Sequence, residues 1–192
     1  MVRAAGTGTI NVGSLPRLIG NPPVFQQGAP PNNPNAIALY PGAKFMYVSD
    51  STANSVSLFS YTASGTPTLA AVYDSGATVG LGPNGLAVDP TGSFLYVANS
   101  GSGTVSAFTI NPNSGVLTPV AGSPFMASGT ASPATPTFVQ VDPSAQFAYV
   151  TNGDAGTISV FSINFATGAL TAVGAPVSTI ISGGGPGSLA IE

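Results

Sequence analysis

The sequence contains no cysteine, no histidine and no tryptophan among its 192 residues. Without cysteine there are no disulfides, no thiolate nucleophiles and no thiolate metal sites. Without histidine the chain lacks the commonest general base and metal ligand. No apolar run approaches the ~18 residues of a membrane span. Glycine and threonine interrupt the first twenty residues, so we expect neither membrane insertion nor a signal peptide in this chain.

Charged side chains are also scarce. Lys and Arg number 3 and Asp and Glu number 6, so charged residues make up 5% of the chain, against roughly 25% in a typical soluble domain. Three cations cannot form the positive surface that a phosphate backbone requires, which excludes nucleic acid as a partner. A net charge of −3 gives little repulsion between copies, which favours association. A composition rich in Ser, Thr, Gly and Asn predicts an extracellular or cell-surface location.

An internal repeat is the main feature that is present. Four prolines recur at intervals of about 50 residues, the period of propellers and solenoids, and each precedes a similar apolar run: Pro34, Pro83, Pro136 and Pro186. We therefore divide the chain into repeats 34–82, 83–135 and 136–185. A fourth repeat is split between the termini, as residues 1–33 plus 186–192.

Each repeat contains four short runs of β-branched and aromatic residues separated by Gly, Asn and Pro, which is the pattern of strands joined by tight turns. The second run is apolar on both sides, so both faces of its sheet must be covered. The fourth ends in Gly-x-Pro in two repeats, as at Gly122-Ser123-Pro124, which is typical of an edge strand. The pattern predicts an all-β chain, a β-propeller of four-stranded antiparallel blades.

The split repeat leaves an unpaired first strand at Leu189–Glu192 and later strands after Met1. Exposed strand edges need partners, so we expect the chain to complete its ring by pairing its ends. We favour a twofold homodimer that closes an eight-bladed ring. The alternatives are a four-bladed monomer, a head-to-tail array, and a chain that is a fragment of a longer propeller.

The phrase Tyr149-Val150-Thr151-Asn152, with Val141-Asp142-Pro143 before it and Gly156–Val160 after it, resembles the YVTN-type repeat and the related lactonase-like β-propellers. The resemblance implies seven or eight blades in one chain. It also implies a lactonase with an acid–base side chain in the central mouth and cations for an anionic substrate. Its motifs describe packing and leave activity open.

Three carboxylates occupy the same position in three repeats: Asp89, Asp142 and Glu192. Ring closure would gather them at one end of the channel, where carboxylate oxygens suit Ca²⁺. An aspartate at a strand end before proline also accepts backbone hydrogen bonds in its turn, and we favour this structural explanation. We therefore assign no metal and no cofactor.

A second equivalent set follows the second strand of each repeat: Asp50, Asn99 and Asn152. Turn chemistry explains these residues as well. The connection from Gly122 to Pro136 contains Phe125 and Met126, which are candidates for a binding loop. The alternative is that both side chains seal the contact with a neighbouring blade.

No serine lies in a recognisable pattern with a base, so we assign no catalytic residue. The expectation from the residues is a non-enzymatic structural or binding scaffold that pairs with itself. The alternatives are a lactonase-like hydrolase of sugar lactones and a subunit of an extracellular filament or surface layer.

Overall fold

The computed structural model describes residues 33–42, 44–61, 65–74, 79–128 and 134–179. All regular structure in these segments consists of β-strands. These residues contain no helix that is long and apolar enough to cross a membrane. The strands are β1 (Pro34–Leu39), β2 (Phe45–Asp50), β3 (Ser55–Tyr61), β4 (Pro67–Asp74), β5 (Pro83–Val88), β6 (Phe94–Asn99), β7 (Thr104–Ile110), β8 (Leu117–Pro119), β9 (Phe125–Met126), β10 (Pro136–Val141), β11 (Phe147–Asn152), β12 (Thr157–Ile163), β13 (Leu170–Ala172) and β14 (Val177–Ser178).

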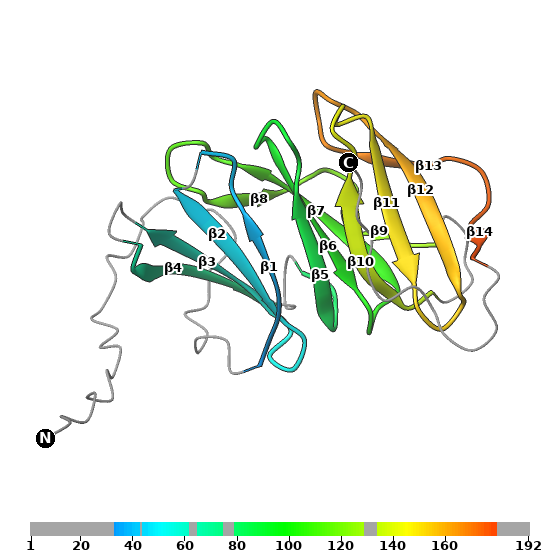
Figure 1. Cartoon of the computed structure of the whole chain (residues 1–192), viewed down its shortest axis with the longest axis horizontal. Coiled ribbons are helices and arrows are strands. Elements are labelled where there is room, and N and C mark those ends of the chain that lie inside the picture. The colour runs from blue at the N-terminus through cyan, green and yellow to red at the C-terminus, as the bar shows by residue number, and fades with distance from the viewer. Residues whose placement is uncertain (1–32, 43, 62–64, 75–78, 129–133, 180–192) are drawn as a thin grey trace, which may run out of the picture.

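The strands form three antiparallel sheets that follow chain order (Figure 1). The first sheet has the order β1-β2-β3-β4. The second has the order β5-β6-β7-β8, and β9 also pairs with β7. The third has the order β10-β11-β12-β13, and β14 also pairs with β12. The prediction of four-stranded antiparallel propeller blades is confirmed, and we call these sheets blades 1, 2 and 3.

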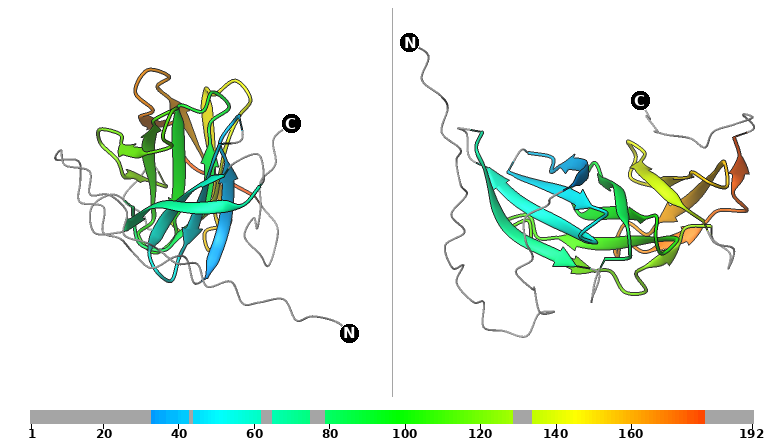
Figure 2. Two further views of the ribbon diagram at one scale, coloured as in Figure 1. Left: turned by 90° about the vertical axis from the view of Figure 1, so that its left-hand side faces the viewer. Right: turned by 90° about the horizontal axis from the view of Figure 1, so that it is seen from below.

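The blades stand side by side in an arc, with the first strands β1, β5 and β10 adjacent to one another (Figure 2). One apolar core fills the space between blades 1 and 2 and another the space between blades 2 and 3. Blade 2 is covered on both faces, so every residue of β6 is buried. Its sequence is therefore a continuous apolar run rather than an alternating one, as expected for a strand with two covered faces.

A tyrosine from each of the first two blades reaches across to the next blade. The Tyr47 hydroxyl donates to the Gly115 carbonyl at 2.7 Å, and the Tyr96 hydroxyl donates to the Gly168 carbonyl at 3.1 Å. Both glycines lie in the turn after the third strand of their blade, at φ 71° and 76°. Each tyrosine buries its ring and satisfies its hydroxyl, so the two contacts fix the register between blades.

Buried tyrosines make the fold sensitive to alkali. Burial raises the pKa of Tyr73 from 10.0 to about 12, although the N–H of Leu117, which donates to its hydroxyl, lowers it. Burial also raises the pKa of Tyr47 and Tyr96. A raised folded-state pKa stabilises the protein fully below pH 10, and this contribution is lost as pH rises through the folded value.

We therefore expect the free energy of unfolding to fall steeply between pH 10 and about 12. Urea denaturation across this range measures the loss, and tyrosinate absorbance followed in parallel shows whether ionisation accompanies unfolding. Ionisation of all tyrosines near pH 10 in a chain that stays folded would contradict the expectation.

The edge strands differ from the sequence-based prediction. We expected the connection from Gly122 to Pro136 to be a loop, but Phe125–Met126 forms β9 and pairs with Thr104 and Val105 of β7. The Gly-Ser-Pro segment therefore interrupts the outer strand instead of ending it. Proline has no N–H for the ladder, and Gly122 has φ 85°, so the strand leaves the sheet at β8 and returns at β9.

The predicted split blade, formed by residues 1–33 and 186–192, lies almost entirely outside the described residues. Asn33, which is described, is linked to blade 1 because its N–H donates to the Asp50 carboxylate at 3.0 Å. The closure of a ring by the chain ends stays a prediction.

Candidate functional site

One end of the blades is lined by polar side chains. The first strands β1, β5 and β10 begin there, and the second strands β2, β6 and β11 end there. In Figure 1 this end is at the bottom for β10 and β11. We call it the polar rim and define it by the residues that begin the first strand, the residues that end the second strand and the turn after the second strand.

A β-bulge opens each first strand at the polar rim. The register shifts between Pro34 and Ala36 in blade 1, and the same shift follows Pro83 and Pro136 in blades 2 and 3. The extra residues of the bulges include Asn35, Asn84 and Thr137. Bulges re-aim side chains and concentrate next to functional sites, so these three residues form the first candidate group, which we call the bulge residues.

A hydroxyl from the second strand holds the bulge open in two blades. In blade 1 the N–H of Ala36 donates to the Ser49 hydroxyl oxygen at 3.2 Å, and that hydroxyl in turn donates to the Asn84 carbonyl of blade 2. In blade 3 the N–H of Phe138 donates to the Thr151 hydroxyl oxygen at 3.1 Å. The buried hydroxyls replace the ladder bonds that the bulge removes.

The bulge residues differ in how much hydrogen-bonding capacity they keep. The Asn35 amide oxygen accepts from the N–H and the hydroxyl of Ser51, at 3.0 and 2.9 Å, and the Asn35 NH₂ group makes no hydrogen bond to a described residue. The Thr137 hydroxyl is 2.9 Å from that of Thr151. The half-buried Asn84 amide makes no hydrogen bond within the described segments.

Adjacent first strands approach closely beside the bulges. A Cβ placed on Gly85 would be 2.7 Å from both the Cα of Phe138 and the carbonyl oxygen of Thr137. Only glycine permits this distance between backbones. The bulge residues of blades 2 and 3 are therefore brought together at the inner side of the arc.

The predicted set Asp50, Asn99 and Asn152 lies at the same rim, fully buried. The Asp50 carboxylate accepts from the N–H groups of Thr52 and Ala53, at 3.0 and 2.8 Å, so it caps the turn after β2. The side-chain NH₂ groups of Asn99 and Asn152 instead each donate to two hydroxyls of the following strand. In both blades the distance from this NH₂ group to the serine hydroxyl is 2.9 Å. These three side chains therefore form a buried layer under the polar rim.

The amide oxygens of Asn99 and Asn152 are buried and have no hydrogen-bond partner within the described segments. The same holds for the hydroxyls of Ser55 and Ser57, which occupy the equivalent layer of blade 1. Each blade therefore carries buried polar atoms under the rim for which the described residues supply no hydrogen-bond partner, which is rare in a folded protein.

Asp89 and Asp142 lie at the opposite end of their blades, between the first and second strands. The Asp89 carboxylate accepts from the N–H of Phe94 at 2.7 Å, and that of Asp142 accepts from the N–H of Phe147 at 2.9 Å. Burial raises the pKa of the Asp142 carboxyl, but hydrogen bonds from the Ser144 hydroxyl and nearby N–H groups outweigh it and lower that pKa overall.

Each aspartate thus caps its own turn. Glu192, the third member of this carboxylate set, is outside the described residues. No group of three His, Cys, Asp or Glu side chains in the described part of the chain could hold a metal ion. The absence of a Ca²⁺ site at this carboxylate set therefore stays a prediction.

Phe125 and Met126 lie on the outer edge of blade 2. Phe125 is partly buried and packs against the core between blades 2 and 3, while Met126 is 44% exposed. The packing of Phe125 fits the alternative explanation that this side chain seals the contact between blades. A ligand role for Phe125 and Met126 stays a prediction.

The described acidic side chains lie at both ends of the blades, three at the polar rim and two, Asp89 and Asp142, at the opposite end. Asp50, Asp74 and Asp154 lie at the polar rim, at the ends of β2 and β4 and in the turn after β11. The exposed Lys44 lies at the opposite end, in the turn before β2. The described part of the rim is therefore negative.

Sequence reasoning missed the bulge residues. The signal was present, because a polar residue follows the aligned proline in three repeats: Pro34-Asn35, Pro83-Asn84 and Pro136-Thr137. A strand pattern does not show that one residue is extra, since bulges appear only when two strands are paired.

The solved structures that are similar to this chain include three named as lactonases, of which two are described here. A putative 6-phosphogluconolactonase from Bacteroides fragilis has a TM-score of 0.67 and 22% identity over 79% of this chain and 40% of that chain. The periplasmic gluconolactonase of Pseudomonas aeruginosa has a TM-score of 0.65 and 22% identity over 81% of this chain and 44% of that chain. At this identity the likeness shows the fold alone.

A functionally unknown protein from Desulfotomaculum acetoxidans is also similar, with a TM-score of 0.63 and 25% identity over 75% of this chain and 42% of that chain. The chain thus spans less than half the length of these solved structures. No curated protein matches its sequence.

A family model described as a seven-bladed β-propeller lactonase matches residues 13–131, which is more than half of the chain. The match contradicts the expectation of a non-enzymatic scaffold and supports the alternative of a lactonase-like hydrolase. The repeat motifs describe blade packing, and the lack of His and Cys does not exclude the family's activity. The chain belongs to the seven-bladed β-propeller lactonase family.

Proposed function

We propose that this chain forms part of a propeller that hydrolyses an uncharged sugar lactone at the polar rim. The observation that carries the proposal is the match of the lactonase family over residues 13–131, which include the bulges of blades 1 and 2. Ligands of propellers bind where loops and strand ends face the central channel. The bulge residues lie at such strand ends.

The chemistry of the rim suits a polyhydroxylated ligand. Sugar hydroxyls pair with neutral amides and hydroxyls, which the rim supplies through Asn35, Asn84 and the serines of the adjacent turns. Hydrolysis places negative charge on the lactone carbonyl oxygen when water attacks it, and N–H donors aimed at that oxygen stabilise the transition state. The amide NH₂ groups of Asn35 and Asn84 are available for this task.

The charge of the rim favours an uncharged lactone over a phosphorylated one. Three carboxylates repel an anionic substrate, and the described cation, Lys44, is at the far end of the blades. The rim therefore differs from the cationic site that a phosphate group requires.

Hydrolysis of glucono-δ-lactone by the purified chain, followed by acid release in a pH-stat, tests the proposal. We expect a rate above the uncatalysed one. The double variant Asn35→Ala, Asn84→Ala should lower kcat/KM by about tenfold or more, since each lost neutral hydrogen bond is worth about 0.5–1.5 kcal/mol.

The matched control is Asn113→Ala, an exposed asparagine in the turn after β7 at the other end of blade 2. It should leave kcat/KM unchanged. No turnover above the uncatalysed rate, or an equal loss in the Asn113 variant, would contradict the proposal.

A further inference from the structure

Two Asn-Gly pairs occur in the sequence, and the fold places both at the polar rim. They are Asn84-Gly85 at the start of β5 and Asn152-Gly153 at the end of β11. An Asn-Gly pair can react with itself, because glycine has no Cβ to keep its backbone nitrogen away from the side-chain carbon of the preceding asparagine. The two pairs carry the same chemistry, so their surroundings decide which of them reacts.

The Asn152-Gly153 pair is held at the groups that would react. Asn152 is fully buried, and its NH₂ group donates to the hydroxyls of Thr157 and Ser159 at 3.1 and 2.9 Å. The Gly153 N–H donates to the Thr135 carbonyl at 2.9 Å. Attack requires these three hydrogen bonds to break, so the fold protects this pair.

The Asn84-Gly85 pair lacks these restraints. The pairing of β5 with β6 passes from Pro83 directly to Leu86, so neither residue of the pair has a strand partner in β6. Asn84 is half-buried, and its amide makes no hydrogen bond to a described residue. The side chain can therefore turn towards the Gly85 nitrogen without breaking a hydrogen bond to the described part of the chain.

A difference between the repeats leaves the Gly85 N–H without a hydroxyl acceptor. In blades 1 and 3 the equivalent N–H donates to a hydroxyl of the second strand, that of Ser49 or Thr151. Blade 2 carries Ala98 at this position of β6. Alanine offers no acceptor, so the bulge residue that is tied down in the other two blades is not tied down in this way here.

Ser49 also activates the pair from the neighbouring blade. Its hydroxyl donates to the Asn84 carbonyl, which is the oxygen of the peptide unit that contains the Gly85 nitrogen. When this nitrogen loses its proton, negative charge spreads onto that oxygen, and a hydrogen bond to the charged form favours it. The Gly85 nitrogen is therefore easier to deprotonate than the nitrogen of a peptide without this donor.

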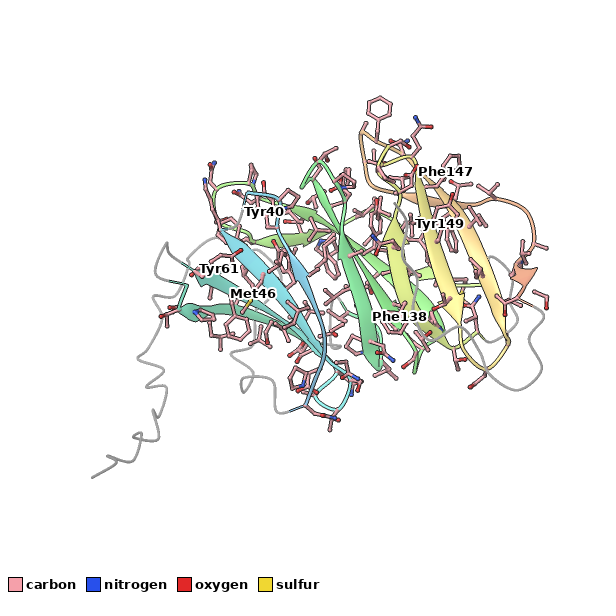
Figure 3. The ribbon with its side chains drawn as sticks, in the orientation of Figure 1. Tyr40, Met46, Tyr61, Phe138, Phe147 and Tyr149 are labelled. Carbon is pink, nitrogen blue, oxygen red and sulfur yellow. The ribbon has the colours of Figure 1, made fainter. Side chains whose placement is uncertain are left out.

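The packing of the blades requires the reactive glycine. A Cβ at Gly85 would be 2.7 Å from Cα of Phe138, which Figure 3 labels near the start of β10. A larger residue at this position would force β5 and β10 apart. The close approach of the two first strands therefore retains the reactive pair.

We propose that Asn84 is a site of spontaneous deamidation. The Gly85 nitrogen gives its proton to hydroxide and attacks the side-chain carbonyl carbon of Asn84, and the new C–N bond closes a succinimide ring. The Asn84 amide nitrogen takes a proton from water and leaves as ammonia. Water then opens the ring at either carbonyl and leaves aspartate or isoaspartate at position 84. The net reaction consumes water and releases ammonia.

The modification changes the chemistry of the polar rim. It replaces the neutral NH₂ donor of Asn84 by a carboxylate, at an end of the blades where Asp50, Asp74 and Asp154 already lie. A further negative charge strengthens the repulsion of anionic ligands. Loss of lactone hydrolysis on ageing follows only under the proposed function, and the test of deamidation does not depend on it.

Mass spectrometry of the full chain after incubation in mildly alkaline buffer and digestion with pepsin tests the proposal. We expect the peptide that contains Asn84 to convert at least about tenfold faster than the peptide that contains Asn152, because three hydrogen bonds protect the second pair. In urea the local sequence sets both rates, which should then agree within about twofold. Equal rates in the folded chain, or no conversion at Asn84, would overturn the proposal.

Ala98→Ser is the matched variant, since it returns the hydroxyl that Ser49 and Thr151 supply in the other blades. It should slow conversion at Asn84 by about threefold or more, as expected for one added hydrogen bond to the Gly85 N–H. Conversion at Asn152 should stay the same. A rate at Asn84 that this variant leaves unchanged would contradict the role given to the Gly85 N–H.

Discussion

Gly115→Ala should lower the free energy of unfolding by about 3 kcal/mol. Gly115 has φ 71°, which costs an alanine about 1–2 kcal/mol. The new methyl would also be 2.7 Å from Cγ of Phe45 and 3.0 Å from Cδ1 of Leu58, both in the core between blades 1 and 2. Overpacking of a filled core costs a further ~1–3 kcal/mol. Urea denaturation at a concentration where the chain is monomeric measures the effect.

Gly174→Ala separates the backbone cost of alanine at positive φ from the cost of overpacking the core. Gly174 has φ 70°, nearly that of Gly115, but a Cβ there would meet nothing within 4 Å. Its cost should therefore be the backbone term alone, about 1 kcal/mol. Equal losses in the two variants would show that the close contact between Gly115 and Phe45 adds nothing to the cost of the methyl group.

Asp89→Ala should destabilise the chain by about 2–3 kcal/mol, as expected for the loss of hydrogen bonds to a buried charged group. Asp89 is 1% exposed, and its carboxylate accepts from the N–H of Phe94 at 2.7 Å, the N–H of Thr91 at 3.1 Å and the Thr91 hydroxyl. Alanine would leave the buried Phe94 N–H without this acceptor. Thermal and urea unfolding measure the loss.

Asp142→Ala is the matched comparison, because Asp142 caps the same turn of blade 3 but is more exposed. Its effect should be smaller and should depend on pH. The pKa of Asp142 is lowered, so its stabilisation is present at neutral pH and is lost as pH falls through the folded value, below 3.8. An Asp142 variant as unstable as the Asp89 variant would mean that burial of the cap does not matter.

The repeat made the blades predictable from the sequence. The aligned second strands Phe45–Val48, Phe94–Val97 and Phe147–Val150 share aromatic and β-branched residues, and in the first two strands the tyrosine crosses to the next blade. Packing of this kind restricts the residue type at the same position of every repeat, so it is visible in the sequence as a periodic pattern. The same periodicity located the turn aspartates Asp89 and Asp142 and the turn set Asp50, Asn99 and Asn152.

The site was much less predictable. Asn35, Asn84 and Thr137 owe their position to bulges, which depend on the pairing of two strands rather than on the local sequence. The interrupted outer strand escaped prediction for the same reason, since Phe125–Met126 is too short to be recognised before β7 is in place. A site formed by a few residues leaves no periodic pattern in the sequence, whereas packing does.

The interrupted outer strands also bear on misfolding. An open strand edge can template the addition of foreign strands and seed amyloid, which needs about six uninterrupted residues. Blades 2 and 3 divide their outer strands into pieces of three and two residues, too short for such a template. Blade 1 keeps eight continuous residues in β4, protected by Pro67 at its start and by the register shift at Leu58 and Phe59 of β3. Among the three described blades, the risk of cross-β growth is therefore largest for blade 1.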